Sequence, residues 1–410
     1  YIANDSGAKH IVCSDTNFGY VKQAIPETDL KKAIAIKLTD LLPWWKKLFG
    51  WTFDRVPKGK VSREDDTLWF EDMVKTGAKD LPPLTHKGKD TAEIIYTGGT
   101  TKFPKGVPIS HGLYLESAGE QISICDPLFA PNENVVLGSA PLFHILGQTC
   151  SLSALLVGGA IVLMPKVNLD AIFDAIHRFK AKTLIGVPTL YRMILDHDRI
   201  DFYDLSSLNY AFNGGDVLPE EISRRWLKKF DRPIYQGYGA TETCGGVTMC
   251  LTDEDNPPKS IGRVLPSKTV KLVDPATLEP VAPGEQGEAL VHSDRMVSAY
   301  WNKPEETKEA FVEIDGLLYY RTADILTIDE KGQYYFVDRT VDTIKHKGYR
   351  VSSSEIEGVL QENQAVIGAC VVGIPDEKVG ERIKAFVVLK EDVKGITGYD
   401  LIKWCRKRLA

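Results

Sequence analysis

The stretch Ile94-Ile-Tyr-Thr-Gly-Gly-Thr-Thr-Lys-Phe-Pro-Lys-Gly106 passes from a short apolar run into glycines, hydroxyls, a proline and a lysine. Its first three residues are β-branched or aromatic and favour a β-strand. Gly98 and Gly99 have no Cβ, so their backbone N–H groups can converge on an anion. The stretch therefore predicts a strand followed by a loop that binds phosphate.

The second half of this loop favours phosphate over a plain solvated turn. Thr100 and Thr101 add hydroxyl donors, Lys105 adds a mobile positive charge, and Pro104 restricts the paths that this charge can take. A Walker A loop is excluded, because Lys105 precedes Gly106 and no Ser or Thr follows in the required order. On glycine content alone, a solvated turn after a strand would be the better interpretation.

The bulk composition sets limits on the class of protein. A chain of 410 residues predicts two to three domains, and a formal charge of −6 argues against a general nucleic-acid binder. The seven cysteines are scattered and never spaced as C-x-x-C, which favours free thiols in a reducing compartment such as the cytoplasm. We find no apolar run long enough to span a bilayer and no signal peptide at the start.

From residue 91 to about 250, short apolar runs alternate with helical patterns, which predicts a doubly wound parallel sheet. Glycine-rich breaks follow several of the apolar runs, at Gly98-Gly99, Gly214-Gly215 and Gly237-Tyr-Gly239. Loops at the carboxyl ends of parallel strands converge on one crevice, so these breaks predict a single nucleotide site. Ser110 is the expected N-cap of a helix that continues to Ile124, and further helices are expected at 170–179 and from Pro219. The expected strands are 135–140, 183–187 and 233–236.

Two further regions have different patterns. Between about 260 and 336 the helical period fades, and strands punctuated by Pro and Gly predict a small antiparallel barrel. From about 342 onward, a hairpin at 344–351, a helix at 354–360, strands at 368–373 and 383–389, and a basic helix predict a separate small α+β domain.

The segment 41–57 mixes aromatic side chains with lysines, beginning at Trp44 and Trp45. Such a mixture suits a peripheral membrane contact, because rings sit at headgroup depth and cations meet anionic lipid. Packing of these aromatics onto the body of the protein is an equally good interpretation, and both stay open.

The phosphate loop, together with Gly237-Tyr-Gly-Ala-Thr-Glu-Thr243, resembles the signatures of the adenylate-forming superfamily of acyl-CoA synthetases, luciferases and peptide-synthetase adenylation domains. Gly98 in the third place of the loop is most similar to long-chain fatty acyl-CoA ligases. Lys102 departs from the usual glycine and would add a second cation beside the phosphates. A dinucleotide-binding G-x-G-x-x-G is excluded, because Glu242 occupies the third glycine position.

The resemblance implies a set of site residues. Thr97 and Glu242 would hold Mg²⁺, and Lys105, His144, Glu242 and Lys345 would be the catalytic residues. His144, Gly147 and Gly214 would lie at the acyl substrate. The implied ATP-binding residues are Thr97, Gly98, Gly99, Thr100, Thr101, Lys105, Gly215, Asp216, Gly237, Tyr238, Gly239, Ala240, Thr241, Asp324, Arg339 and Lys345.

Several of these residues also have a plainer interpretation. A carboxylate such as Glu242 is often an exposed loop residue, and Asp324 with Arg339 could be a surface ion pair. A lone histidine in an apolar run, such as His144, is usually a core residue, and the apolar run 152–163 could be core or tunnel wall. The joint occurrence of the motifs in one order favours the site interpretation.

The implied fold is α/β. A large AMP-binding domain would span 1–339, with the barrel subdomain at about 260–336, and a partial, mobile C-terminal domain would span 340–410. Two departures affect this domain pair: Ala323 replaces a glycine beside Asp324, and Val341 replaces the usual Asp or Lys at the pivot. Both termini are expected to be truncated, and the lysine of the adenylation step is expected beyond Ala410.

The implied activity is an ATP- and Mg²⁺-dependent acid:CoA ligase that forms an acyl-adenylate and then a thioester with coenzyme A. A medium- or long-chain fatty acid is the expected substrate. The alternatives are an aryl or other acid ligase of the same superfamily, or a weakened nucleotide or acyl binder, which the departures at Lys102 and Val341 would permit. Whether the chain forms a homodimer is left open.

Overall fold

The computed structural model describes residues 1–37, 39–40, 44–52, 59, 61, 67–77, 80, 82–98, 103–125, 133–164, 167–340, 342, 344–346, 349–376, 378–390, 393 and 395–409. The chain divides into two compact units. The first consists of Tyr1–Lys87, Tyr96–Val107 and Trp301–Lys303, and the second of Gly88–Ile95, Pro108–Tyr300 and Pro304–Ala410.

The first unit contains a parallel sheet of β1 (His10–Ser14), β2 (Lys32–Ile36) and β3 (Thr67–Trp69). The apolar run at 33–36 therefore forms a strand. Phe18 and Val21 of α2 (Phe18–Ala24) pack against Ala33 and Ala35 of β2, which are fully buried. The other helices of this unit are α1 (Ile2–Ser6), α3 (Trp44–Thr52) and α4 (Phe70–Thr76).

The apolar start of the phosphate loop is a strand, as predicted. It forms β4 (Thr91–Thr97), which pairs with β5 (Lys105–Ser110). Helix α5 (His111–Cys125) follows directly, and the Ser110 hydroxyl accepts a hydrogen bond from the backbone N–H of Leu113 at 3.2 Å. This is the predicted N-terminal cap, which satisfies one of the unpaired donors of the first turn.

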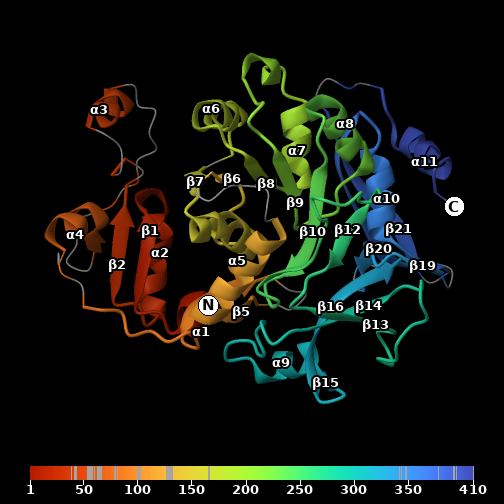
Figure 1. The fold of residues 1–410 in the computed structure, drawn as a ribbon, viewed down its shortest axis with the longest axis horizontal. Helices are drawn as coiled ribbons and strands as arrows, with labels where there is room; N and C mark the ends of the chain where they lie inside the picture. Colours follow the sequence, from red (N-terminus) through yellow and green to blue (C-terminus); the bar gives the residue numbers. More distant parts are fainter. Residues whose placement is uncertain are drawn as a thin grey trace. The chain divides into compact units, whose positions relative to one another are not determined.

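The second unit contains the predicted parallel sheet (Figure 1). Its parallel strands occur in the order β7 (Ala160–Leu163), β6 (Val135–Gly138), β8 (Thr183–Gly186), β9 (Tyr210–Asn213) and β10 (Ile234–Ala240). The helices between them are α6 (Leu169–Phe179), α7 (Pro188–Leu195) and α8 (Glu220–Phe230). Pro219 is the N-cap of α8 and Glu220 its first residue, so the predicted helix begins one residue later than expected.

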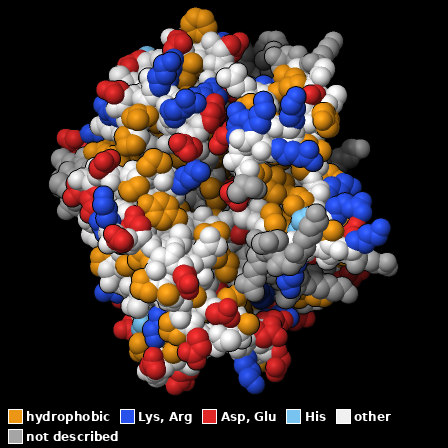
Figure 2. Space-filling model, turned by 90° about the vertical axis from the view of Figure 1, so that its right-hand side faces the viewer, with side chains coloured by type: hydrophobic (Ala, Val, Ile, Leu, Met, Phe, Trp, Pro, Cys, Tyr) orange, Lys and Arg blue, Asp and Glu red, His pale blue; other side chains and the backbone are white. Residues whose placement is uncertain are grey.

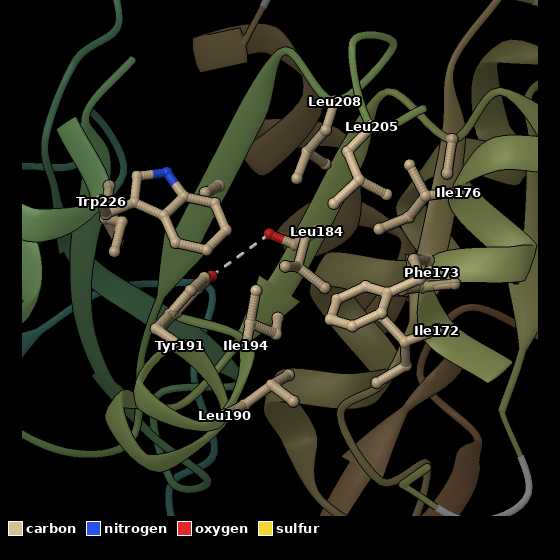
Figure 3. Packing of buried hydrophobic residues seen from close by; sticks show 14 of the residues in the cluster. Ile172, Phe173, Ile176, Leu184, Leu190, Tyr191, Ile194, Leu205, Leu208 and Trp226 are labelled. Carbon is tan, nitrogen blue, oxygen red and sulfur yellow. Dashed lines mark hydrogen bonds between the residues drawn. The ribbon is translucent and has the colours of Figure 1, made fainter. Parts of the chain in front are cut away.

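One face of this parallel sheet carries the main hydrophobic core. Leu137, Leu184, Ala211 and Ile234 are register partners across four neighbouring strands, so they lie in one row on one face. Side chains of α6, α7 and α8 cover this row, among them Phe173, Tyr191 and Trp226 (Figure 3). The alternate residues of the same strands face the other way, and they form part of the candidate site.

The region 260–336 is antiparallel, as predicted. The large sheet continues from β10 through β11 (Gly245–Met249), β12 (Ser260–Val264), β17 (Tyr334–Arg339), β16 (Leu317–Ile328), β14 (Gly287–His292) and β13 (Thr269–Val273). Strand β15 (Phe311–Ile314), preceded by α9 (Pro304–Ala310), pairs with β16. This strand order among the described residues is open at β13, so the predicted barrel is not confirmed.

The C-terminal region also has the predicted elements. Strands β19 (Tyr349–Val351), β18 (Ile344–His346), β21 (Gly380–Leu389) and β20 (Val366–Asp376) form a sheet in this order, with helices α10 (Ser353–Gln361) and α11 (Gly398–Arg406). Buried side chains of α10, α11 and the sheet make its core. The domain boundary at 339/340 stays a prediction.

Figure 2 shows a face of the molecule on which apolar, acidic and basic side chains are interspersed.

The structure explains why Ala323 is a costly departure from the motif glycine. Its φ is +59°, in the left-handed region that favours glycine. The conformation is held from both sides, because the Thr340 N–H and hydroxyl donate to the Ala323 carbonyl at 2.8 and 3.1 Å. The Ala323 N–H donates to Glu288. The neighbouring strands thus impose a backbone conformation that alanine adopts at a cost of about 1–2 kcal/mol.

We expect the substitution Ala323→Gly to stabilise the protein by about 0.5–1 kcal/mol, because relief of this strain outweighs the greater entropy of an unfolded glycine. Thermal unfolding would show a rise of about 1–2 °C. The control is Ala276→Gly, at an exposed turn position outside the left-handed region, which should lower stability slightly. A loss of stability in Ala323→Gly equal to that of the control would contradict the strain.

Candidate functional site

Two of the three predicted glycine-rich segments lie together at one cavity of the second unit. Its lining includes Gly214 and Gly215, directly after β9, and Gly237, Tyr238 and Gly239 within β10. The Gly237–Gly239 segment was predicted as a break after a strand, but β10 continues through it to Ala240. The strand can continue because a Cβ at position 239 would overlap the Gly245 carbonyl group on β11, and glycine avoids this.

The cavity extends along the sheet face opposite the main core. Val136, Thr183, Ile185 and Phe212 line it from three parallel strands. Asn134, which precedes β6, lines its far end near Thr183, and their side chains share a hydrogen bond of 3.1 Å. From this end to the glycines after β9 is about five strand residues, or roughly 15 Å.

The opposite wall comes from α5 and the π-helix Leu146–Leu152. Gln121, Leu146, Thr149 and Cys150 belong to it. None of the described lining residues is an Asp, Glu, Lys or Arg. The cavity therefore offers apolar and neutral polar walls, which suit an uncharged group.

His144 is an exposed lining residue of this cavity. Partial burial lowers the pKa of its imidazole, because desolvation disfavours the charged form. Its Nδ1 accepts a hydrogen bond from the Leu146 N–H at 3.2 Å. The Leu146 N–H thus orients the His144 ring at the cavity wall, where the resemblance predicts the acyl substrate.

Glu242 lies in a tight turn directly after β10. The Ala240 N–H donates to the Thr243 hydroxyl at 3.1 Å, and the Thr241 carbonyl accepts from the Cys244 N–H at 3.0 Å. The Glu242 residue is only 5% exposed, and its Oε1 accepts a hydrogen bond from the Tyr300 hydroxyl at 2.6 Å. It is thus not an ordinary exposed loop carboxylate.

Asp324 lies on β16 and Tyr238 on β10, and their side chains are in contact. The Tyr238 hydroxyl donates to Asp324 Oδ2 at 2.6 Å, and Arg339, its register partner on β17, lies 3.5 Å from Oδ1. Burial raises the pKa of Asp324, although the tyrosine hydroxyl and the arginine work in the opposite direction. A raised carboxyl pKa means that the ionised group costs folding stability, and this cost disappears as the pH falls.

The phosphate-loop residues belong to the first unit or lie outside the described residues. Thr97, Gly98 and Lys105 are in the first unit, so their predicted approach to Glu242 stays a prediction. The predictions made for Gly99, Thr100, Thr101, Lys102 and Val341 concern residues outside the described part of the chain.

The remaining predicted residues lie away from the cavity lining. A Cβ on Gly147 would overlap the Pro141 carbonyl group, so this glycine permits close packing of the π-helix and is not among the lining residues. Asp216 is exposed, and its Oδ1 accepts from the Val217 N–H at 2.8 Å. Lys345 is exposed on β18. Of the run 152–163, only Ser153 is a lining residue.

Several residues at the site had no sequence signal. Gln121 and Phe212 line the cavity, and Tyr300 binds Glu242, but none of them belongs to a motif that we used. Asn213 directly precedes Gly214 and Gly215, and no role was predicted for it. Its side chain is buried, and its Oδ1 has no hydrogen-bond partner among the described residues, which leaves an acceptor at the cavity wall. Only tertiary contacts reveal these four residues.

The described residues contain no cluster of three His, Cys, Asp or Glu side chains that could enclose a metal ion. Glu242 nevertheless fits Mg²⁺, which proteins commonly hold through one or two carboxylates plus the phosphates of a substrate. Its Oε1 is engaged by Tyr300, and Oε2 has no hydrogen-bond partner among the described residues. A magnesium ion would supply positive charge to the phosphates there.

Comparison with known proteins agrees with this arrangement. Residues 1–301 match the AMP-binding enzyme family, and residues 355–410 match the AMP-binding enzyme C-terminal domain. The chain belongs to the AMP-binding enzyme family. The recognition of the adenylate-forming superfamily from the sequence is thereby confirmed, as is the α/β class with a large N-terminal and a small C-terminal part.

Relatives within this family include ligases for different acids. A long-chain-fatty-acid–CoA ligase of Bacillus subtilis (strain 168) is 35% identical over 322 residues, which cover 78% of this chain and 56% of the relative. A feruloyl-CoA synthase of Amycolatopsis sp is 34% identical over 361 residues, 87% of this chain and 68% of the relative. The chain thus spans little more than half of the Bacillus ligase.

Among solved structures, an anthranilate CoA ligase in complex with anthranoyl-AMP matches with a TM-score of 0.85. The match covers 100% of this chain and 74% of that chain at 24% sequence identity, so it supports the fold alone. Within the described part of this AMP-binding enzyme, we find no helix that is both long and apolar enough to cross a membrane.

The two motif glycines of β10 should respond differently to alanine. A Cβ at position 239 overlaps the Gly245 carbonyl, whereas one at position 237 has Thr248 O as its nearest neighbour at 3.5 Å, an ordinary contact. We expect Gly239→Ala to cost about 1–3 kcal/mol and Gly237→Ala less than about 1 kcal/mol. Urea unfolding of both variants measures this, and equal costs would contradict the close approach of β10 and β11.

Proposed function

We propose that this AMP-binding enzyme is an ATP- and Mg²⁺-dependent acid:CoA ligase, acting on a medium- or long-chain fatty acid. The observation that carries the proposal is the cavity shared by the glycine-rich segments and the uncharged sheet face. The nucleotide motifs line one end, and walls without an Asp, Glu, Lys or Arg side chain lead away from it. An uncharged acyl tail fits such walls, because no buried charge is left unpaired.

The proposed chemistry overcomes the poor reactivity of a carboxylate. The carboxylate oxygen attacks the α-phosphorus of ATP, the bond to the β-phosphate breaks, and pyrophosphate leaves. The sulfur of coenzyme A then attacks the acyl carbon, the bond to the AMP oxygen breaks, and AMP leaves with a thioester formed. The thiol loses its proton in this second step.

The first step brings an anion up to a triphosphate. Two like charges about 4 Å apart repel by about 4 kcal/mol at an effective dielectric of about 20. In the proposal, Lys105 and a magnesium ion held by Glu242 and Thr97 offset this repulsion. Asp324, with Tyr238 and Arg339 in contact, would accept both ribose hydroxyls through its two oxygens.

The depth of the cavity supports an alkyl chain of medium length. An extended chain advances roughly 1.3 Å per carbon, from a C–C bond of about 1.5 Å, so roughly 15 Å holds about twelve carbons. The second candidate is an aryl acid, because the ring of Phe212 lines the cavity and the feruloyl-CoA synthase is a relative. The third is a weakened nucleotide or acyl binder.

Pyrophosphate release with a graded series of acids tests these candidates. We expect release with straight-chain acids of eight to sixteen carbons and little with hydroxycinnamic acids. Thr183→Met lengthens a side chain at the far end, so it should lower the rate with the longest acids several-fold and spare the shortest. Release with aryl acids alone would refute the fatty-acid substrate. Tight ATP binding without release for any acid would favour the weakened binder.

The proposal places the protein in the cytoplasm, with peripheral membrane contact through 41–57. Trp44, Trp45 and Leu48 of α3 are 76%, 48% and 57% exposed, and Lys46 lies 5.2 Å from the Trp45 ring centroid. Exposed rings beside cations suit the headgroup region. Whether two copies associate is still open.

Replacing Trp44 and Trp45 by Ser should reduce co-sedimentation with anionic liposomes at least five-fold, because the rings would no longer enter the headgroup region. Tyr20, 77% exposed in the same unit, offers the matched control Tyr20→Ser, which should leave binding unchanged. Equal binding by the double-tryptophan variant and wild type would remove the membrane contact from the proposal.

A further inference from the structure

Tyr300 is a buried side chain whose hydroxyl contacts a predicted metal ligand. It is 4% exposed, and its Oη donates to Glu242 Oε1 at 2.6 Å. That distance is typical of a hydroxyl bonded to an ionised carboxylate, which is among the stronger hydrogen bonds in proteins. No role was predicted for Tyr300, which follows β14 in the sequence.

The position of the Tyr300 hydroxyl is well fixed. Its backbone N–H donates to the Thr307 hydroxyl at 3.0 Å, and its ring packs edge-on against Phe311 with centroids 5.7 Å apart. Phe311 also contacts the Tyr320 ring at 5.3 Å, and these two residues are register partners on β15 and β16. Two strands therefore hold the ring from one side.

Burial and the nearby Glu242 charge raise the pKa of the Tyr300 hydroxyl. Tyr300 is therefore the donor in its hydrogen bond to the carboxylate, and Glu242 Oε1 is the acceptor.

Other hydrogen bonds hold the backbone around Glu242, but they do not set the direction of the Glu242 side chain. Lys268 Nζ donates to the Thr243 carbonyl at 3.2 Å, and the Ser117 hydroxyl donates to the Cys244 carbonyl. The Val297 N–H donates to the Glu242 carbonyl at 3.2 Å. Among the described residues, Tyr300 is thus the group that takes one carboxylate oxygen and leaves Oε2 for another partner.

We propose that Tyr300 is a positioning residue that aims the Glu242 carboxylate at the phosphate-bound metal ion. The inference rests on the proposed function, since that function makes Glu242 a metal ligand. A purely structural tyrosine would also satisfy the buried carboxylate. The two roles differ in one measurable respect: only positioning changes how magnesium affects nucleotide binding.

The test uses Tyr300→Phe, because phenylalanine keeps the ring and removes only the hydroxyl. Calorimetry measures the affinity for ATP with and without Mg²⁺, and thermal unfolding measures stability separately. We expect Tyr300→Phe to reduce the magnesium-dependent gain in ATP affinity five- to ten-fold, with the affinity in EDTA unchanged.

The matched control is Tyr335→Phe. Tyr335 also donates to a carboxylate, Asp329 Oδ2 at 2.9 Å, but in a turn of the sheet outside the cavity lining. This variant should keep the full magnesium effect. Glu242→Gln serves as the reference and should abolish that effect.

Three results would overturn the proposal. A lower melting temperature for Tyr300→Phe with an unchanged magnesium effect would make the tyrosine purely structural. An unchanged magnesium effect in Glu242→Gln, or a wild-type protein whose ATP binding ignores Mg²⁺, would remove Glu242 as the ligand. Failure of the proposed ligase activity looks different: wild-type protein would release no pyrophosphate with any acid while magnesium still strengthened ATP binding.

Discussion

The candidate site depends on two carboxylates kept inside the protein, each bonded to a tyrosine hydroxyl at 2.6 Å. Burying a charge is unfavourable unless hydrogen bonds compensate it, and burial raises the pKa of Asp324 even with its tyrosine and arginine in place. The fold tolerates this cost at the end of β10 and in β16. Such a cost is expected where a protein must present ionised oxygens to a ligand.

The regular part of the fold follows from short-range pattern. Leu137, Leu184 and Ala211 come from apolar runs of four or five residues separated by helical patterns, and such runs become parallel strands because both faces are covered. The helix N-cap at Ser110 could also be predicted, because a hydroxyl side chain directly before a helical run commonly caps the helix. These features need no knowledge of distant residues.

Errors arose where a distant strand decides the local conformation. The Gly237–Gly239 segment has the composition of a loop, but β11 runs beside it and leaves no room for a Cβ at position 239, so glycine lets the strand continue. The expected barrel is not confirmed: alternating strands predict the antiparallel pairing that is observed, but closure depends on the partners of the edge strand β13. The proposed role of Tyr300 could not be predicted from the sequence, because it depends on one contact with a residue 58 positions away.

The proposed reaction in two steps requires a C-terminal domain that can leave its docking position. The contact between α7 and the α10–β20 region is largely polar. Arg192, 7% exposed, donates to the carbonyls of Val366 and Ile367 at 2.7 and 3.0 Å and to that of Gln361 at 3.3 Å. Lys390 adds an ion pair with Asp196 at 3.4 Å. Carbonyls and charges released from such a contact are readily hydrated, unlike apolar side chains. A polar contact of this kind would let the predicted mobile domain be well placed when docked and still undock at moderate cost.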